Sequence, residues 1–316
     1  MRKNINFVGN IKKYLICSAM IFIIGIIFMF VFGVNLDINF KGGTRFTYTF
    51  ENELSLNDAD TVIEETIGKP VDVIESTDIT GASKKLIITL AADEAVSTEI
   101  QKSLTEALQE KFPDNNIQLG DSNTVNPLLA KSFFAKSIAA VLLASILVII
   151  YIGIRFRRIG GISAGIMAWV ALFHDILVAF FTCVIFKLQI DANFMAVVLT
   201  ILGYSLNDTI VIYDRIRDNR KKDTKTPIGE LVNLSINQTL GRTLMTSVAT
   251  LIAMLTVIVV AEIYGLTTLR SFAIPMALGI ISGSYSTICL TGPLWVKWIE
   301  FKDKRERAKG RKNKKK

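Results

Sequence analysis

The chain has few residues of the kinds that build metal centres or disulfide frameworks. It contains one histidine and three cysteines in 316 residues. Cys17, Cys183 and Cys289 all fall in long apolar runs and have no metal-ligand spacing, so they cannot staple a hydrophilic domain or hold a zinc ion. We therefore expect no disulfide scaffold, no bound metal and no organic cofactor.

Charged residues are missing from several stretches that are each long enough to cross a bilayer. Hydrophobic residues make up 51 % of the chain, and the mean hydropathy is +0.43. A helix of about 20 apolar residues crosses the ~30 Å hydrocarbon core. The sequence predicts an α-helical integral membrane protein with six spans, at 14–34, 133–154, 161–186, 192–213, 240–260 and 269–295. The first is predicted to stay as an anchor, since no small-x-small cleavage site follows its long apolar core.

Basic residues collect on alternate connections between these spans. They are dense in 1–13, in 214–239 and in the tail 296–316, whereas 35–132 holds 17 acidic and 8 basic residues. The positive-inside rule then places both termini and the loop 214–239 in the cytoplasm and 35–132 outside, in a protein of the cytoplasmic membrane. The tail directly follows a span and lacks interleaved aromatic residues, so we expect it to contact anionic lipid and not nucleic acid.

The region 35–132 has the pattern of a small α+β domain. Four β-rich runs and two helical runs alternate in the order β-α-β-β-α-β, which is typical of a ferredoxin-like fold. The predicted strands are 44–50, 71–77, 84–91 and 116–120, and the predicted helices are 56–67 and 94–111. The region contains no histidine and no cysteine, and its carboxylates show no catalytic spacing. We expect it to grip a polypeptide or a partner domain and not to be an enzyme.

Ionisable residues inside the predicted spans are the strongest functional signal. Asp208, Asp175 and His174 lie within spans, and Arg242 lies at the start of another. A charge near the bilayer centre costs at least ~2.5 kcal/mol, so such residues usually serve ion or proton movement. Asp208 and Arg242 form a candidate proton-coupling pair. His174 and Asp175 form a candidate proton-entry pair, because the imidazole of histidine is the side chain that can change its charge near neutral pH.

Each assignment has a structural alternative. Asp208, together with Asn207 and Thr209, could be a structural residue that forms hydrogen bonds to a neighbouring helix. Arg242 could extend its guanidinium group to the inner membrane interface. The two residues of the proton-entry pair could instead fix helix packing or dock a partner.

Two further polar residues, Asn237 and Gln238, precede Arg242 on the same segment and are expected to solvate either arrangement of the charged pair. If the spans align at their centres, Asp175 and Asp208 differ in depth by about 12 Å at 1.5 Å of rise per residue. A proton relay between them would then need water.

Five segments match, in order, the motifs of one known family. They are FKGGT (40–44), ALFHD (171–175), GYSLNDTIVIYDRIRDN (203–219), INQTLGRTL (236–244) and SGSYSTICLTGPL (282–294). On these motifs, which extend over nearly the whole chain, the protein resembles the SecF subunits of bacterial protein export, in the SecD/SecF family of the resistance-nodulation-division superfamily.

The resemblance implies that the chain is half of a twelve-span unit and that a six-span SecD partner completes it. The unit would act with the SecYEG translocon on unfolded polypeptides. It also implies that Asp208 and Arg242 couple protons, the only coupling ion expected. One position departs from the family pattern. Where Gly-Ile-Asp-Phe is usual, the chain has Asn39 in place of the acid, with Asp37 two residues earlier. Gly42 and Gly43 are retained, which fits a positive φ where the first strand begins.

The sequence therefore predicts an accessory subunit of the Sec translocase that uses the proton motive force to promote export. A proton-driven small-molecule exporter of the same superfamily is one alternative. It is disfavoured because such pumps resemble twelve-span chains with two large outer domains, whereas this chain has one region of about 100 outer residues. A scaffold that stabilises the translocon without transport is the other alternative.

Overall fold

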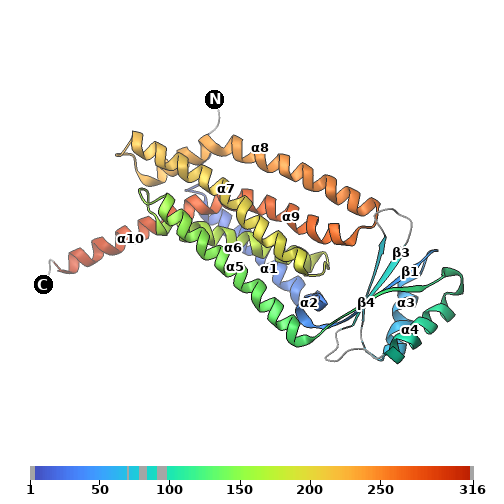
Figure 1. The fold of residues 1–316 in the computed structure, drawn as a ribbon. Coiled ribbons are helices and arrows are strands. Elements are labelled where there is room, and N and C mark those ends of the chain that lie inside the picture. The colour runs from blue at the N-terminus through green and yellow to red at the C-terminus, as the bar shows by residue number, and fades with distance from the viewer. Residues whose placement is uncertain (1–3, 70, 78–83, 91–97, 314–316) are drawn as a thin grey trace.

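The computed structural model describes residues 4–69, 71–77, 84–90 and 98–313, with side chains described up to residue 307. Long helices form a bundle, and a small α+β domain stands at one end of it (Figure 1). The first and last described residues both lie toward the opposite end of the bundle (Figure 1).

Within the described residues, six helical runs are long and apolar enough to cross a membrane. This confirms the predicted fold class of a six-span helical membrane protein with an added α+β domain. The six are α1 (Ile11–Phe32), α5 (Pro127–Arg155), α6 (Ile162–Ile185), α7 (Ala192–Lys222), α8 (Ile228–Ile263) and the continuous run of α9 (Thr267–Ser286), η2 (Thr287–Thr291) and α10 (Gly292–Asn313).

The segment 214–239, expected as a loop, is mostly helical. α7 continues to Lys222 and α8 begins at Ile228, so only five residues, 223–227, connect them. No glycine or proline occurs between residues 214 and 222, and an ion pair of 2.7 Å between Arg217 and Asp214, one turn apart, supports the extension. Hydropathy marks where the apolar run ends, whereas a helix continues until a breaker or a cap stops it.

The α+β domain has the predicted ferredoxin-like topology. Its four strands form an antiparallel sheet in the order β2-β3-β1-β4. The elements are β1 (Gly43–Phe50), α3 (Leu56–Ile67), β2 (Asp72–Thr77), β3 (Lys84–Leu90), α4 (Thr98–Lys111), η1 (Pro113–Asn115) and β4 (Gln118–Val125). The predicted last residue of β3, at 91, and the predicted start of the second helix, 94–97, lie outside the described residues.

The core of this domain follows from alternation along β1. Phe46, Tyr48 and Phe50 are all buried, since every second residue of a strand points to the same face. That face packs against α3 and α4, which contribute buried residues such as Ile63 and Leu104. The hydrophobic core thus lies between the sheet and two helices, and it is separate from the cores of the bundle.

A short segment connects α1 to the sheet and fixes the domain against the bundle. After α2 (Ile38–Lys41), Gly42 and Gly43 have φ values of 83° and 134°, which confirms the predicted positive φ. Gly42 also touches α5 closely, because a Cβ at this position would lie 2.8 Å from Cα of Pro127. Glycine is the residue that adopts this positive φ readily and also leaves room for Pro127.

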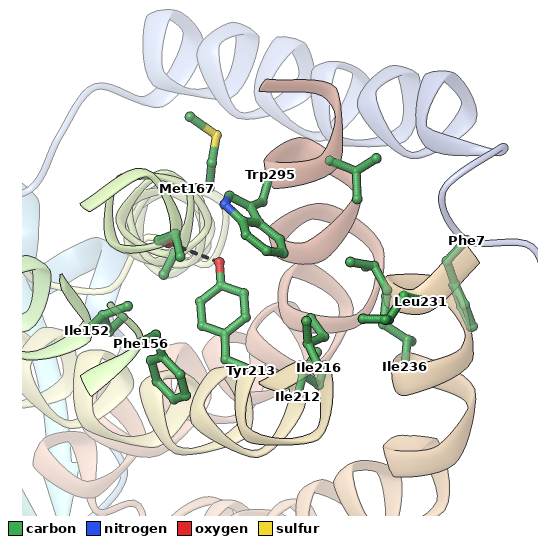
Figure 2. Close-up of a cluster of buried hydrophobic side chains, with 14 of the residues drawn as sticks. Phe7, Ile152, Phe156, Met167, Ile212, Tyr213, Ile216, Leu231, Ile236 and Trp295 are labelled. Atoms are coloured by element: carbon green, nitrogen blue, oxygen red, sulfur yellow. Dashed lines mark hydrogen bonds between the residues drawn. The ribbon is translucent and has the colours of Figure 1, made fainter. Parts of the chain in front are cut away.

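The inner helices of the bundle are α6, α7 and the α9–α10 run. In its most apolar stretch, the α9–α10 run has 78 % of its residues buried, against 11 % for α1 and for α8. At the end away from the α+β domain, Trp295, Tyr213 and Phe156 form a fully buried aromatic cluster (Figure 2). Tyr213 Oη donates to the carbonyl of Ala164 at 2.9 Å. The exposed apolar faces of α1, α5 and α8 are left to lipid or to another protein.

Candidate functional site

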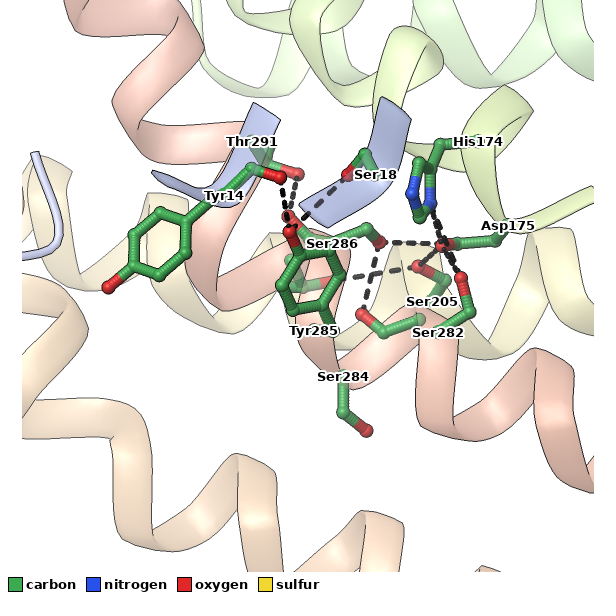
Figure 3. A network of polar contacts seen from close by, with 12 residues as sticks. Tyr14, Ser18, His174, Asp175, Ser205, Ser282, Ser284, Tyr285, Ser286 and Thr291 are labelled. Atoms are coloured by element: carbon green, nitrogen blue, oxygen red, sulfur yellow. Dashed lines mark hydrogen bonds and ion pairs between the residues drawn. The ribbon is translucent and has the colours of Figure 1, made fainter. Parts of the chain in front are cut away.

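Asp175, in the middle of α6, lies at the centre of a buried hydrogen-bond network (Figure 3). Its side chain is 0 % exposed. Ser282 Oγ donates to Oδ1 at 2.7 Å, while Ser286 Oγ and Ser205 Oγ donate to Oδ2 at 2.7 and 2.9 Å. Three hydroxyl groups from α7 and α9 therefore satisfy a carboxyl group that has no access to water.

The backbone departs from a regular α-helix beside this network. Residues 287–291 form a π-helical turn at the end of α9, a distortion that often accompanies functional sites. Ser282 and Ser286 are four residues apart and so share one face of α9. Gly283 allows α7 to approach that face, since a Cβ there would lie 3.2 Å from Cβ of Ser205.

His174 extends the network toward α1. Its Nδ1 lies 3.2 Å from Asp175 Oδ1 and 3.3 Å from Ser282 Oγ. The ring is 6 % exposed and packs against Phe22 and Tyr285, with centroid distances of 5.1 and 5.9 Å. Its Nε2 is buried without a hydrogen-bond partner. The structure thus brings the predicted proton-entry pair together and leaves one imidazole nitrogen available to a further group.

Asp208 lies on α7 one turn beyond Ser205 and is 4 % exposed. Ser247 of α8 and the positively charged Arg242 both lie near enough to act on its carboxyl group. Its Oδ2 nevertheless has no hydrogen-bond partner. Arg242 is exposed, and no ion pair joins it to Asp208 in the described part of the chain. The candidate pair is therefore close enough to interact but is not closed, with an acceptor unused on the acid.

Ser205 connects the two acidic positions of α6 and α7. Asp175 bonds Ser205, which precedes Asp208 by three residues on α7, and three residues rise about 4.5 Å along a helix axis. Ser205 thus stands between the two predicted pairs.

Among the predicted supporting residues, Thr209 is buried next to Asp208, whereas Asn207 is exposed. Asn237 and Gln238 have other partners. Asn237 bonds the backbone of Ile5 at 3.0 and 2.8 Å, so it anchors the N-terminal segment to α8.

Gln238 Oε1 accepts from Arg215 at 2.6 Å and from Asn219 at 2.8 Å. It therefore joins the inner ends of α7 and α8. Neither Asn237 nor Gln238 solvates Asp208 in this arrangement, because both side chains are engaged elsewhere.

Asp37 is a buried acidic residue where α2 meets the α+β domain. It is 1 % exposed, caps α2 and forms an ion pair with Arg45 of β1. Asn39 donates to it from both its backbone and its side chain, at 2.8 and 2.6 Å. Burial lowers the pKa of Arg45, while the negative charge of Asp191 opposes that shift. Asp37 thus places a buried carboxylate beside Asn39, in a contact between α2 and the sheet.

Sequence reasoning missed the serines that hold Asp175, and also Ser247. Ser205 falls in the motif at 203–219 and the other two in the motif at 282–294, so both segments were noted but no serine was singled out. Serine is common in membrane helices, where it usually bonds its own backbone. Only the four-residue spacing of Ser282 and Ser286 is a signal that could have indicated a shared polar face.

Comparison with known proteins matches the whole of this architecture. The family model described as "Protein export membrane protein SecD/SecF, C-terminal" matches residues 103–301. A protein translocase subunit SecF of Rhodothermus marinus is 34 % identical over 297 residues, covering 92 % of each chain. One of Borreliella burgdorferi is 34 % identical over 301 residues, covering 93 % of this chain and 97 % of that one.

Two solved structures are also similar to this chain along nearly its whole length. A SecDF crystal structure from Thermus thermophilus is 29 % identical, with a TM-score of 0.78, and covers 95 % of this chain. A SecDF in a super-membrane-facing form is 30 % identical, with a TM-score of 0.68, and covers 98 %. The chain spans only 39 % and 40 % of the length of those two SecDF chains. The family model and the full-length relatives together establish that the chain belongs to the SecD/SecF family of protein-export membrane proteins.

Proposed function

We propose that the chain is an accessory subunit of the Sec protein-export translocase, and that it works as half of a twelve-span unit whose other half is a SecD-type partner. The observation that supports this most is the match along nearly all of the chain to relatives named protein translocase subunit SecF. The six-span bundle and its one α+β domain correspond to about two fifths of the SecDF chains, which supports pairing with a SecD-type partner.

The face that would receive such a partner includes α8. Few residues of its apolar stretch are buried, and Arg242 is exposed on it while reaching the buried Asp208 electrostatically. A partner packed against α8 would bury Arg242 away from water and lipid. Charges on both halves of the unit would then act on its guanidinium group. The coupling pair would then lie at the interface between the two halves.

Proton coupling would use Oδ2 of Asp208, which has no hydrogen-bond partner. A shift of the Arg242 guanidinium toward Asp208 favours the ionised carboxylate, and a shift away favours the protonated acid. A proton crossing the membrane potential contributes ~2.3 kcal/mol per 100 mV. Complete switching of a two-state element needs ~5.5 kcal/mol, so the pH gradient or a second proton has to contribute as well.

Asp175 would have a different task. Its carboxyl group is held by three serines from two helices, which supports a role in fixing the packing of α6, α7 and α9. His174, with one nitrogen free of partners, is the member of the pair better placed to exchange a proton with water or with a partner chain.

The remaining assignments complete this proposal. The protein would reside in the cytoplasmic membrane with both termini in the cytoplasm, where the basic tail would contact anionic lipid. The α+β domain would act outside on unfolded polypeptides that leave SecYEG, without enzymatic activity of its own. The location of both described chain ends away from that domain supports this orientation (Figure 1).

The test is secretion of a reporter protein in cells whose only copy carries Asp208→Asn. The matched control is Asp218→Asn on the same helix, where the carboxylate is 48 % exposed and pairs with Arg217 and Lys221. We expect Asp208→Asn to reduce export to the level of a deletion while the protein still co-purifies with its SecD partner, and the control to secrete normally. Unchanged export in Asp208→Asn would refute proton coupling at this residue and favour the scaffold.

A further inference from the structure

The sheet of the α+β domain has one covered edge and one open edge. β2 forms the covered edge, and its residues 72–76 are all partly buried. Ser76 Oγ donates to the carbonyl of Gly265 at 3.4 Å and accepts from Thr267 Oγ1 at 3.1 Å, where α8 passes into α9. β4 forms the other edge, and residues 120–124 are all exposed. Because neighbouring residues of a strand point to opposite faces, both faces of β4 are open.

The backbone of β4 has hydrogen-bonding groups to spare. β4 pairs with β1, and in the described part of the chain no backbone-to-backbone hydrogen bond beyond this ladder involves residues 118–125. The register shifts once, at Gly120, and residues 121–125 then pair without interruption with residues 43–47. The outer side of an edge strand is a row of unpaired N–H and C=O groups. A regular stretch of five residues is therefore free to accept another strand.

Apart from the bulge at Gly120, the common protections of an edge strand are missing from this stretch. Natural edges often carry lysine or proline, or are covered by a helix or loop. Residues 121–125 read Asp-Ser-Asn-Thr-Val, with neither lysine nor proline. Among the described elements, β4 packs mainly against β1 and the short α2. Nothing in this part of the molecule thus prevents a further strand from pairing with β4.

The side chains of β4 indicate which partner fits. Residues 120–124 include no large apolar side chain, so a folded domain would find no apolar core for a stable interface there. A second copy is disfavoured by charge, since the region 35–132 holds 17 acidic and 8 basic residues and would repel itself. An extended polypeptide needs only its main chain for strand addition. The same acidic charge would attract a neutral or basic segment in preference to an acidic one.

The open edge also lies away from the face proposed for the SecD-type partner. β4 continues through Asn126, which caps α5, so the open edge is on the α5 side of the domain. Figure 1 shows α5 and α8 on opposite sides of the bundle. A partner packed against α8 would therefore leave β4 accessible.

We propose that the edge of β4 binds an extended segment of an unfolded polypeptide by strand addition along residues 121–125, with neutral or basic segments preferred. This inference rests on the proposed function, in which the α+β domain acts on unfolded polypeptides, and it assigns the surface that holds them. Main-chain hydrogen bonds do not depend on the side chains of the bound segment, so the edge would accept many sequences. Five residues form only a few such bonds, so each segment would be held weakly and released readily.

The experiment is photocrosslinking of the purified full chain, in detergent, to a short fluorescent peptide of alternating threonine and lysine. A photoreactive benzoylphenylalanine is placed at Asn123 or, as the matched control, at Thr61, which is exposed on α3 of the same domain. The competing probe is the same peptide N-methylated at every residue, which removes its N–H donors and keeps its side chains. We expect crosslinking at Asn123 and not at Thr61. The N-methylated peptide should bind at least about fivefold more weakly, as for the loss of one main-chain hydrogen bond.

Two proline variants test the strand itself. Adjacent residues of a strand direct their N–H groups to opposite sides, and proline has no N–H. One of Ser122→Pro and Asn123→Pro should therefore weaken the ladder with β1, and the other should alter only the open edge. We expect the variant that keeps the protease resistance of the unaltered chain to bind the peptide about fivefold more weakly, measured by fluorescence anisotropy.

The outcomes separate this proposal from the proposed function. Equal crosslinking at Asn123 and Thr61, or equal binding of the N-methylated peptide, overturns strand addition and leaves the role in export untouched. Loss of the Asn123 crosslink when the SecD-type partner is added assigns the edge to that partner and also overturns the proposal. Failure of a SecD-type partner to co-purify counts against the proposed function alone, because peptide binding at β4 is measured on this chain by itself.

Discussion

Replacing Ser286 with alanine should destabilise the bundle measurably, because its hydroxyl is one of three that satisfy Asp175. The hydroxyl is fully buried and donates at 2.7 Å. Removing one partner of a buried polar group costs about 1–3 kcal/mol, while hydrogen bonds between membrane helices average about 0.6 and reach about 1.7 kcal/mol. Since no water reaches Asp175, we expect a loss near the upper membrane value, about 1.5 kcal/mol. Ser284→Ala is the matched control, because Ser284 donates only to its own helix, to the carbonyl of Ile280 at 2.9 Å.

The assay is reversible unfolding in mixed micelles with increasing dodecyl sulfate, followed by tryptophan fluorescence. Trp295 is fully buried in the aromatic cluster and reports loss of packing. A double-mutant cycle with Asp175→Asn should give a coupling of about 1 kcal/mol between Ser286 and Asp175. If Ser286→Ala and Ser284→Ala cost the same within about 0.5 kcal/mol, the network does not stabilise the bundle, and Asp175 has to be reconsidered as a proton carrier.

Two glycine positions give further predictions from the same structure. Gly165→Ala should lower the free energy of unfolding by about 1–3 kcal/mol in the same assay, because its Cβ would lie 2.9 Å from a backbone carbonyl oxygen of α5. Gly203→Ala is the matched control and should be neutral or stabilising, since nothing lies within 4 Å of its Cβ. Equal losses of stability in the two variants would contradict the close approach of α5 and α6. Gly42→Ala should release the α+β domain from the bundle and increase cleavage by protease near residue 42, since it combines a φ of 83° with contact to Pro127. Gly68→Ala is the matched control. The φ of 70° at this position strains the backbone of alanine, but nothing lies within 4 Å of the Cβ, so the variant should not release the α+β domain from the bundle.

The sequence predicted the fold because each signal for it is local. Six long, predominantly apolar runs form helices in a bilayer, since every backbone polar group has to be satisfied within the segment. The alternation of Phe46, Tyr48 and Phe50 and the helical pattern of 56–67 similarly identify the ferredoxin-like domain. The predicted loop at 214–239 failed because hydropathy reports contact with lipid and not the end of a helix.

The candidate site was predicted only in part. Asp208, Asp175 and His174 are conspicuous in sequence because a charge in an apolar run is expensive. Their partners are not, because Ser205 and Ser286 are ordinary helix residues until two helices meet.

The amino-acid sequence by itself therefore determined the number of spans, the order of elements in the α+β domain and which ionisable residues lie in the membrane. Tertiary structure alone decided the three serines around Asp175, the incomplete pairing of Asp208 with Arg242, and the close approach of Gly42 to α5. The physical reason is that hydropathy, periodicity and charge act along the chain, whereas hydrogen-bond partners in a membrane are set by how helices pack side by side, which short-range sequence patterns do not encode.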